Sequence, residues 1–122
     1  MIKKDIKKLP SNIRSQYRRL QVMHAEKKIQ RKAQHDFMSF TKAVWPEFIE
    51  GAHHRVIAQK FNDLADKKIN RLIINMPPRH TKSEFASYLL PAWMVGKNPK
   101  LKIIQATHTG ELAVRFGRKA KT

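Results

Sequence analysis

The 122-residue sequence contains no cysteine, which excludes both a disulfide framework and a thiolate metal site. It also lacks an apolar run of the roughly 20 residues that a membrane-spanning helix needs. The N-terminal stretch MIKKDIKKLP is rich in lysine, but no apolar segment follows it, so we do not expect a secretory signal peptide. The length suits one domain with a modest core, and we expect an intracellular protein without membrane contact.

Acidic residues are scarce. Nine Asp and Glu stand against 26 Lys and Arg, which gives a formal net charge of +17. Such an excess repels itself unless a polyanion screens it, so the charge favours a nucleic-acid partner, with acidic proteins or lipid surfaces as alternatives.

The charge is densest in residues 1–42, which we interpret as a basic helical N-terminal region. Apolar residues from Ile13 to Phe40 recur at spacings of three and four, as in a helix. Two interpretations of this helix remain open: a solvated basic helix that packs on something by its apolar stripe, or a DNA- or partner-binding arm.

Residues 43–122 alternate between helical and strand-like patterns. Helical spacing over residues 53–68 precedes the apolar stretch RLIIN, and a second helix over residues 82–96 precedes LKIIQAT. We predict an α/β fold, a partial P-loop NTPase with a parallel strand–loop–helix–strand core. Two strands do not complete a sheet, so we expect an incomplete domain.

Glycine is scarce too, and its absence is notable in the stretch NMPPRHTKSE, Asn75–Glu84. The phosphate-binding pattern G-x-x-x-x-G-K-[ST], called Walker A, would place glycines at Met76 and Thr81. In that pattern Lys82 reaches the outer phosphates of ATP and Ser83 offers its hydroxyl to Mg²⁺. The alternative is an ordinary strand–turn–helix, because the Cβ of Thr81 stands where glycine lets the backbone approach phosphate closely.

The stretch from Arg71 to Arg118 resembles the start of the ATPase domain of tailed-bacteriophage large terminase subunits, the DNA-packaging motors. The family's loop reads Asn-Met-Pro-Pro-Arg-His-Gly-Lys-Ser-Glu, and this chain departs from it only at Thr81. A second likeness lies upstream, where the family has an aromatic–Pro segment and a His pair near the adenine. The residues that resemble this region are Trp45, Pro46, His53 and His54, and the candidate base contacts are Phe48, His53 and His54.

The resemblance, which covers roughly residues 36–122, implies a nucleotide site with ATP and Mg²⁺ as cofactors. Its catalytic residues would be Lys82 and Arg79, and Ser83 would bind Mg²⁺ through the nucleotide. The implied nucleotide contacts are Pro78, Arg79, His80, Thr81, Lys82, Ser83 and His54.

The resemblance also implies that ATP hydrolysis drives double-stranded viral DNA into the procapsid. The expected partners are the portal protein, the small terminase subunit and further copies of the same chain in a ring. The expected location is the host cytoplasm, transiently at the procapsid portal, with no membrane.

Carboxylates that the family requires are missing. No acid follows an apolar strand here, and no carboxylate-rich nuclease domain is present. We therefore interpret residues 43–122 as the start of a P-loop ATPase domain that is inactive by itself. The alternative is a small basic DNA-binding or capsid-associated protein with a non-functional loop. We expect Glu84 to act through its charge at the start of the helix, and Tyr88 and Trp93 to lie in the core. Arg115 and Arg118 are expected either on a solvated helix face or in contact with DNA.

Overall fold

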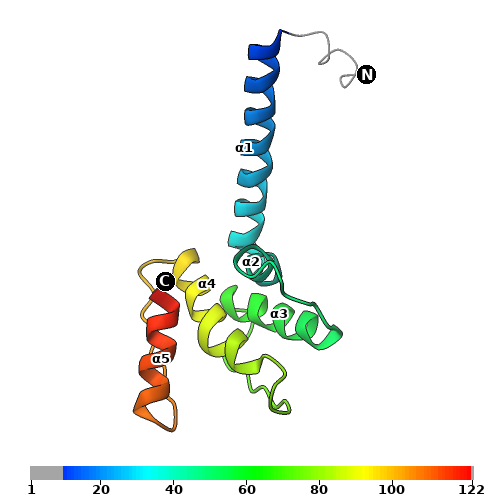
Figure 1. The fold of residues 1–122 in the computed structure, drawn as a ribbon. Coiled ribbons are helices and arrows are strands. Elements are labelled where there is room, and N and C mark those ends of the chain that lie inside the picture. The colour runs from blue at the N-terminus through cyan, green and yellow to red at the C-terminus, as the bar shows by residue number, and fades with distance from the viewer. Residues whose placement is uncertain (1–9, 122) are drawn as a thin grey trace.

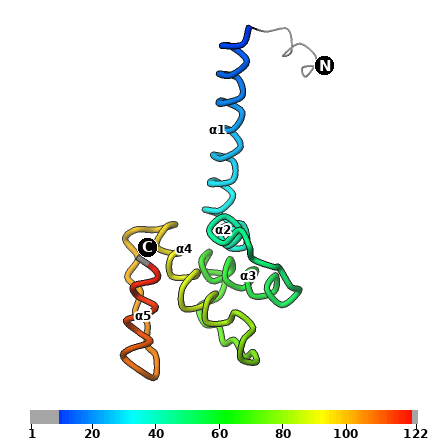
Figure 2. Tube along the Cα trace, in the orientation of Figure 1, coloured from blue at the N-terminus to red at the C-terminus, as the bar shows by residue number. Residues whose placement is uncertain are grey.

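The computed structural model describes residues 10–121, and within them every regular element is helical (Figure 1). The elements are α1 Ser11–His35, α2 Phe37–Val44, α3 Ala52–Ala65, the π-helical η2 Glu84–Leu89, α4 Leu90–Lys97 and α5 Gly110–Lys121. Helix α1 projects as a rod from a body that the other helices form. The Cα trace shows the chain leaving α4, running away from it, and returning through α5 (Figure 2).

The core of the body is built around the aromatic ring of Phe37, which is fully buried. Its ring lies edge-on to Phe61, Phe85 and Trp93, with centroid distances of 4.9, 5.4 and 5.5 Å. Edge-to-face contacts of this kind add stability beyond the area they bury. One side chain from α2 therefore holds α3, η2 and α4 together.

A polar network fixes the break between α1 and α2. Asp36, the N-cap of α2, accepts hydrogen bonds from the backbone N–H of Ser39 at 2.8 Å and from the side-chain amide of Asn62 at 3.0 Å. The amide oxygen of Asn62 in turn accepts from the backbone N–H of Phe37 at 2.9 Å. The predicted single helix from Ile13 to Phe40 is therefore two helices, because Asp36 caps the second one and ties it to α3.

The helix that follows the loop is continuous from Lys82 to Lys97 and includes the π-helical turn. Pro91 has no backbone N–H, so the carbonyl of Ser87 loses its usual helical donor. The side-chain amide of Gln105 donates to that carbonyl at 2.8 Å instead. Pro91 thus alters the local hydrogen bonding without ending the helix, and the gap it leaves anchors the segment that leads to α5.

The α/β prediction is wrong for residues 10–121, where no strand or sheet forms. The stretches expected to be parallel strands, 71–75 and 101–107, have no regular secondary structure. In the first stretch, alternate residues still face the core: Leu72, Ile74 and Met76 pack against it, while Ile73 is 85% exposed. A strand also needs a neighbour for its backbone hydrogen bonds, and here residues 72–76 lie against helix side chains.

Helix α1 is exposed along nearly its whole length. Only Ala33, near its C-terminal end, is buried, and the indole N–H of Trp93 donates to the Ala33 carbonyl at 2.8 Å. Leu20, Val22, Met23 and Ile29 are all at least half exposed. Among residues 10–121, the apolar stripe of α1 therefore packs on the body only along its last two turns. Among the described residues no helix is both long and apolar enough to cross a membrane.

Candidate functional site

The loop before Lys82 has an unusual backbone. Arg79 and Thr81 adopt left-handed conformations, with φ of 65° and 58°. Such angles are uncommon outside glycine and are a real outlier for a β-branched residue such as threonine. Thr81 therefore adopts the kind of conformation for which the phosphate-loop pattern uses glycine.

The side chain of Thr81 is held by His54 of α3. His54 Nδ1 accepts a hydrogen bond from the backbone N–H of Gly51 at 2.9 Å, so the neutral ring carries its proton on Nε2. That Nε2–H donates to Thr81 Oγ1 at 2.6 Å, and the Thr81 hydroxyl donates to the carbonyl of His80 at 2.7 Å. The chain of hydrogen bonds has one direction, from Gly51 to His80, and it joins the start of α3 to the loop.

His54 is buried, 6% exposed, and its ring packs against Phe48 and Phe85 at centroid distances of 4.8 and 5.1 Å. Burial lowers the pKa of His54 below its usual value, and the nearby His53 and His80 lower it further, while Glu50 acts in the opposite sense. The folded protein therefore favours the neutral ring, which is the form that the Gly51 hydrogen bond requires.

The charged side chains of the loop differ in burial and in their contacts. Lys82 is half-buried and its ammonium donates to the carbonyl of Met76 at 3.3 Å, which folds the side chain back over the loop. Arg79 and His80 are exposed, and His80 Nδ1 donates to the carbonyl of Pro78 at 3.0 Å. Ser83 is exposed, and its side chain makes no capping hydrogen bond to the helix that follows.

A shallow groove of about 360 Å³ reaches this loop. It lies between α3 and residues 72–76, and its apolar wall is formed by Val56, Ile57, Leu72, Ile74 and Met76. His53 lies at the same groove, 5.9 Å from His80 between ring centroids. An aromatic base would find apolar contact here beside a cationic loop.

The residues present fit a phosphate ligand better than a metal held by the protein alone. Across residues 10–121 no group of three or more His, Asp or Glu side chains is placed to hold a metal ion. The loop instead offers two cations, an exposed hydroxyl and left-handed turns at the start of a helix, a combination that suits phosphate oxygens. A divalent cation would then have to arrive with the nucleotide, with Ser83 as its protein contact.

Of the residues predicted for the site, the structure brings together two sets: the loop from Pro78 to Ser83, and the ring cluster of Phe48, His53 and His54 beside it. Arg115 and Arg118 lie elsewhere, exposed on α5.

Glu84 pairs with Lys119 of α5 at 2.7 Å, so it does more than place a negative charge at the start of its helix. The core position predicted for Trp93 is confirmed, at 2% exposed, and Tyr88 is half-buried with the Lys119 ammonium 5.1 Å from its ring centre.

Sequence reasoning missed the bond between His54 and Thr81. The hydrogen bond between Gly51 and His54 did have a signal in the sequence. His54 follows Gly51 by three residues, which is the spacing of a capping box. The contact with Thr81 spans 27 positions and has no signature in the spacing of residues. Gly51 itself has little room: a Cβ there would lie 2.9 Å from the His53 ring.

The comparisons with known proteins find no relative for this chain. No protein family, no curated protein and no solved structure matches it.

Proposed function

We propose that residues 78–83 bind the triphosphate of ATP with its Mg²⁺, and that the chain is the nucleotide-binding part of a DNA-packaging motor of the large-terminase type. The observation that carries the proposal is the left-handed backbone at Thr81, directly before Lys82 and the start of a helix. A threonine there is strained, and such strain tends to accumulate where a loop has a binding task. The proposal rests on the loop and not on a sheet.

The contacts support a division of roles. Lys82 and Arg79 supply positive charge to the phosphates, and the helix start at Lys82 adds its unpaired backbone N–H groups. Ser83 offers an oxygen to Mg²⁺, and the groove beside His53 accepts the base. His54 keeps the Thr81 side chain against α3 through its 2.6 Å hydrogen bond. Bound ATP would supply the free energy by which a motor moves double-stranded DNA.

Titration of a fluorescent ATP analogue in the presence of Mg²⁺ tests the proposal, with wild type compared with Lys82→Ala. Loss of a hydrogen bond from a charged donor costs about 1.5–3 kcal/mol, which is a ten- to hundredfold weaker Kd. Lys100→Ala is the matched control, because Lys100 is an exposed lysine beyond the C-terminal end of the helix that begins at Lys82. Equal affinity in wild type and Lys82→Ala would remove the nucleotide site, and equal losses in both variants would show that only net charge matters.

A further inference from the structure

We propose that α1 is a binding arm for double-stranded nucleic acid, which it contacts through the phosphate backbone with Arg18, Arg19, Lys27, Lys28, Arg31 and Lys32. This site lies on a different element from the nucleotide loop and does not depend on ATP.

The salt bridges of the protein lie in its body and not in α1. Several acidic residues of the body pair with nearby lysines or arginines: Glu50 with Lys42 and Arg55, Asp63 and Asp66 with Lys68, and Glu84 with Lys119. None of the six cations of α1 named above forms a salt bridge with a carboxylate among residues 10–121. The acid within α1, Glu26, has no Lys or Arg three or four positions away. Lys32 interacts electrostatically with Asp36 at the end of the helix, and the other five cations have no salt-bridge partner among residues 10–121.

Like charges lie close to one another along α1. Lys27 lies one turn from Arg31, and Lys28 lies one turn from Lys32. Like charges at this spacing destabilise a helix by about 0.2–0.5 kcal/mol per pair. A polyanion lying along the helix would relieve the repulsion among these four cations. A sequence that accepts such unfavourable local spacing commonly does so at a functional surface.

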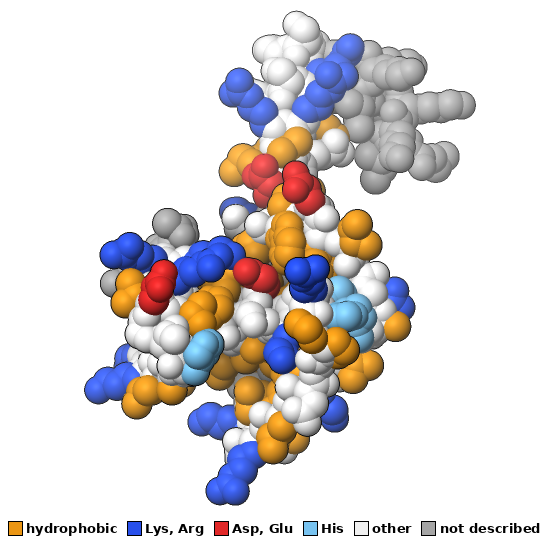
Figure 3. Space-filling model, turned by 60° about the horizontal axis from the view of Figure 1, so that its bottom comes forward, with side chains coloured by type: hydrophobic (Ala, Val, Ile, Leu, Met, Phe, Trp, Pro, Cys, Tyr) orange, Lys and Arg blue, Asp and Glu red, His pale blue; other side chains and the backbone are white. Residues whose placement is uncertain are grey.

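The shape of α1 also suits a nucleic-acid duplex. Helix α1 has 25 residues, which corresponds to a rod about 37 Å long. It stands clear of the body except at its C-terminal end (Figure 1), and Lys and Arg side chains project from it on more than one side (Figure 3). Duplex DNA carries one negative charge per roughly 1.7 Å of its axis, so a rod of this length faces many phosphates, and its width fits the major groove.

The arrangement of apolar residues disfavours a membrane surface as the occupant. Leu20 and Val22 are separated by about 200° around the helix, so they lie on nearly opposite sides. Met23 lies on the side of Leu20 and Ile29 on the side of Val22, so these exposed residues form two narrow strips on opposite sides of the helix and no single apolar face. A helix that lies in a membrane interface needs such a face, whereas contact with phosphates requires only accessible cations.

The test uses the whole chain and a fluorescein-labelled DNA duplex of about 20 base pairs, without nucleotide, over a series of salt concentrations. Anisotropy should give a linear fall of log K with log salt for wild type. The variant K27Q/K28Q/R31Q/K32Q keeps strong helix formers and removes four charges. It should bind at least about tenfold more weakly, with a salt slope smaller by about 3–4.

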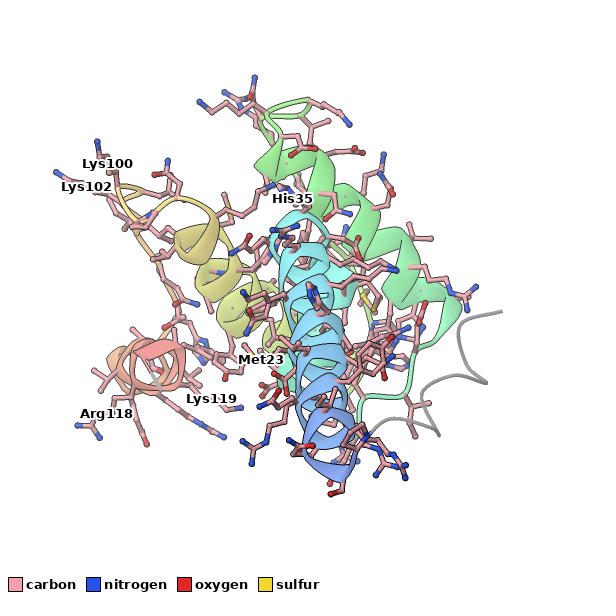
Figure 4. The ribbon with its side chains drawn as sticks, turned by 90° about the horizontal axis from the view of Figure 1, so that it is seen from above. Met23, His35, Lys100, Lys102, Arg118 and Lys119 are labelled. Atoms are coloured by element: carbon pink, nitrogen blue, oxygen red, sulfur yellow. The ribbon has the colours of Figure 1, made fainter. Side chains whose placement is uncertain are left out.

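The matched control is K67Q/R71Q/K100Q/K102Q, which removes the same charge from exposed body positions. Lys100 and Lys102 lie to the side of α1 when the molecule is viewed from above (Figure 4). A control that loses as much affinity and slope as the α1 variant overturns the proposal, because overall charge would then explain binding. Helical circular dichroism checks folding, and R18Q/R19Q, at positions far from the body, provides a second variant that leaves the core untouched.

Two further measurements distinguish duplex binding by α1 from binding of acidic proteins and from the nucleotide site. Poly-glutamate at equal charge concentration should compete more weakly than unlabelled duplex, and equal competition would assign the arm to acidic proteins and overturn the duplex proposal. Lys82→Ala should bind the duplex as wild type does. A loop that fails to bind ATP therefore leaves the arm unaffected, and an arm that fails to bind DNA leaves the loop unaffected.

Discussion

Protonation of His54 is expected to loosen the loop and lower the stability of the whole body. In the neutral ring, Nδ1 accepts from the Gly51 N–H at 2.9 Å. A proton added at Nδ1 turns the acceptor into a donor, so two donors face each other and the Gly51 N–H loses its partner. Leaving a fully buried donor unpaired costs about 1–3 kcal/mol, and the partly buried Gly51 N–H falls toward the lower end of that range. The Nε2–H bond to Thr81 becomes charge-assisted and recovers part of this, which leaves a net cost of about 1 kcal/mol.

The direction with pH follows from the lowered pKa of His54 in the folded protein, whose usual value is 6.5. Below pH 6.5 the unfolded chain takes up a proton that the folded protein resists, so the unfolded state binds more protons. Stability is therefore fully present above pH 6.5 and is lost as the pH falls from there toward the lowered pKa. A loss of about 1 kcal/mol corresponds to a fall in Tm of about 4 °C for a chain of this size.

Urea unfolding at a series of pH values between about 8 and 5 measures this loss for wild type, His54→Gln and His108→Gln. The variant at His54 cannot titrate and should show a flatter dependence on pH. His108, an exposed histidine, is the matched control and should leave the dependence as in wild type. The comparison of slopes cancels the contribution of His53 and His80, which face the same ring. An equal slope in wild type and His54→Gln would refute the reasoning.

Two other predictions follow from the core and the loop. Phe37→Ala should destabilise the protein by about 3–5 kcal/mol, because the ring is fully buried and contacts three other aromatic rings; urea unfolding with the exposed Val44→Ala as control measures it. Thr81→Gly should relieve about 1–2 kcal/mol of left-handed backbone strain, which stabilises the folded protein. The variant also loses the His54 hydrogen bond and gives the unfolded chain more conformational entropy, and both effects destabilise it. The effects oppose each other, so the urea midpoint of unfolding should change little. The same variant should bind the ATP analogue at least as tightly as wild type, and weaker binding would show that the threonine is adapted to this loop.

Local patterns in the sequence predicted the helices well and their packing poorly. Helical spacing placed the segments that became α3 and the helix from Lys82 to Lys97, and Trp93 was correctly expected in the core. The spacing could not reveal that Asp36 breaks the first helix, because its partner Asn62 is 26 positions away. It also could not reveal that α1 has almost nothing to pack on, since an apolar residue at helical spacing reads the same whether or not a neighbour is present.

The strand predictions failed for a related reason. The stretch 71–75 has the composition of a strand, and its alternation of inward and outward residues is retained. Composition specifies which side of the chain faces a core, but a sheet also requires a second stretch at hydrogen-bonding distance. In residues 10–121 the inward side chains of this segment pack against the helical core, so the alternation with a period of two is kept although no strand pairing forms.

The loop shows how a motif and its local conformation can be separated from the fold that usually carries them. A phosphate loop needs a left-handed residue before its lysine, a helix that begins at that lysine, and cations near the helix start. All three are present at Thr81, Lys82 and Arg79 without a strand before them. Threonine can hold this conformation because its hydroxyl is fixed between His54 and the His80 carbonyl, two hydrogen bonds that glycine could not make. The strain at Thr81 and the burial of His54 are therefore one coupled feature, and a change at either residue should be felt at the other. Double-variant analysis of Thr81→Gly with His54→Gln should accordingly show unfolding free energies that do not add.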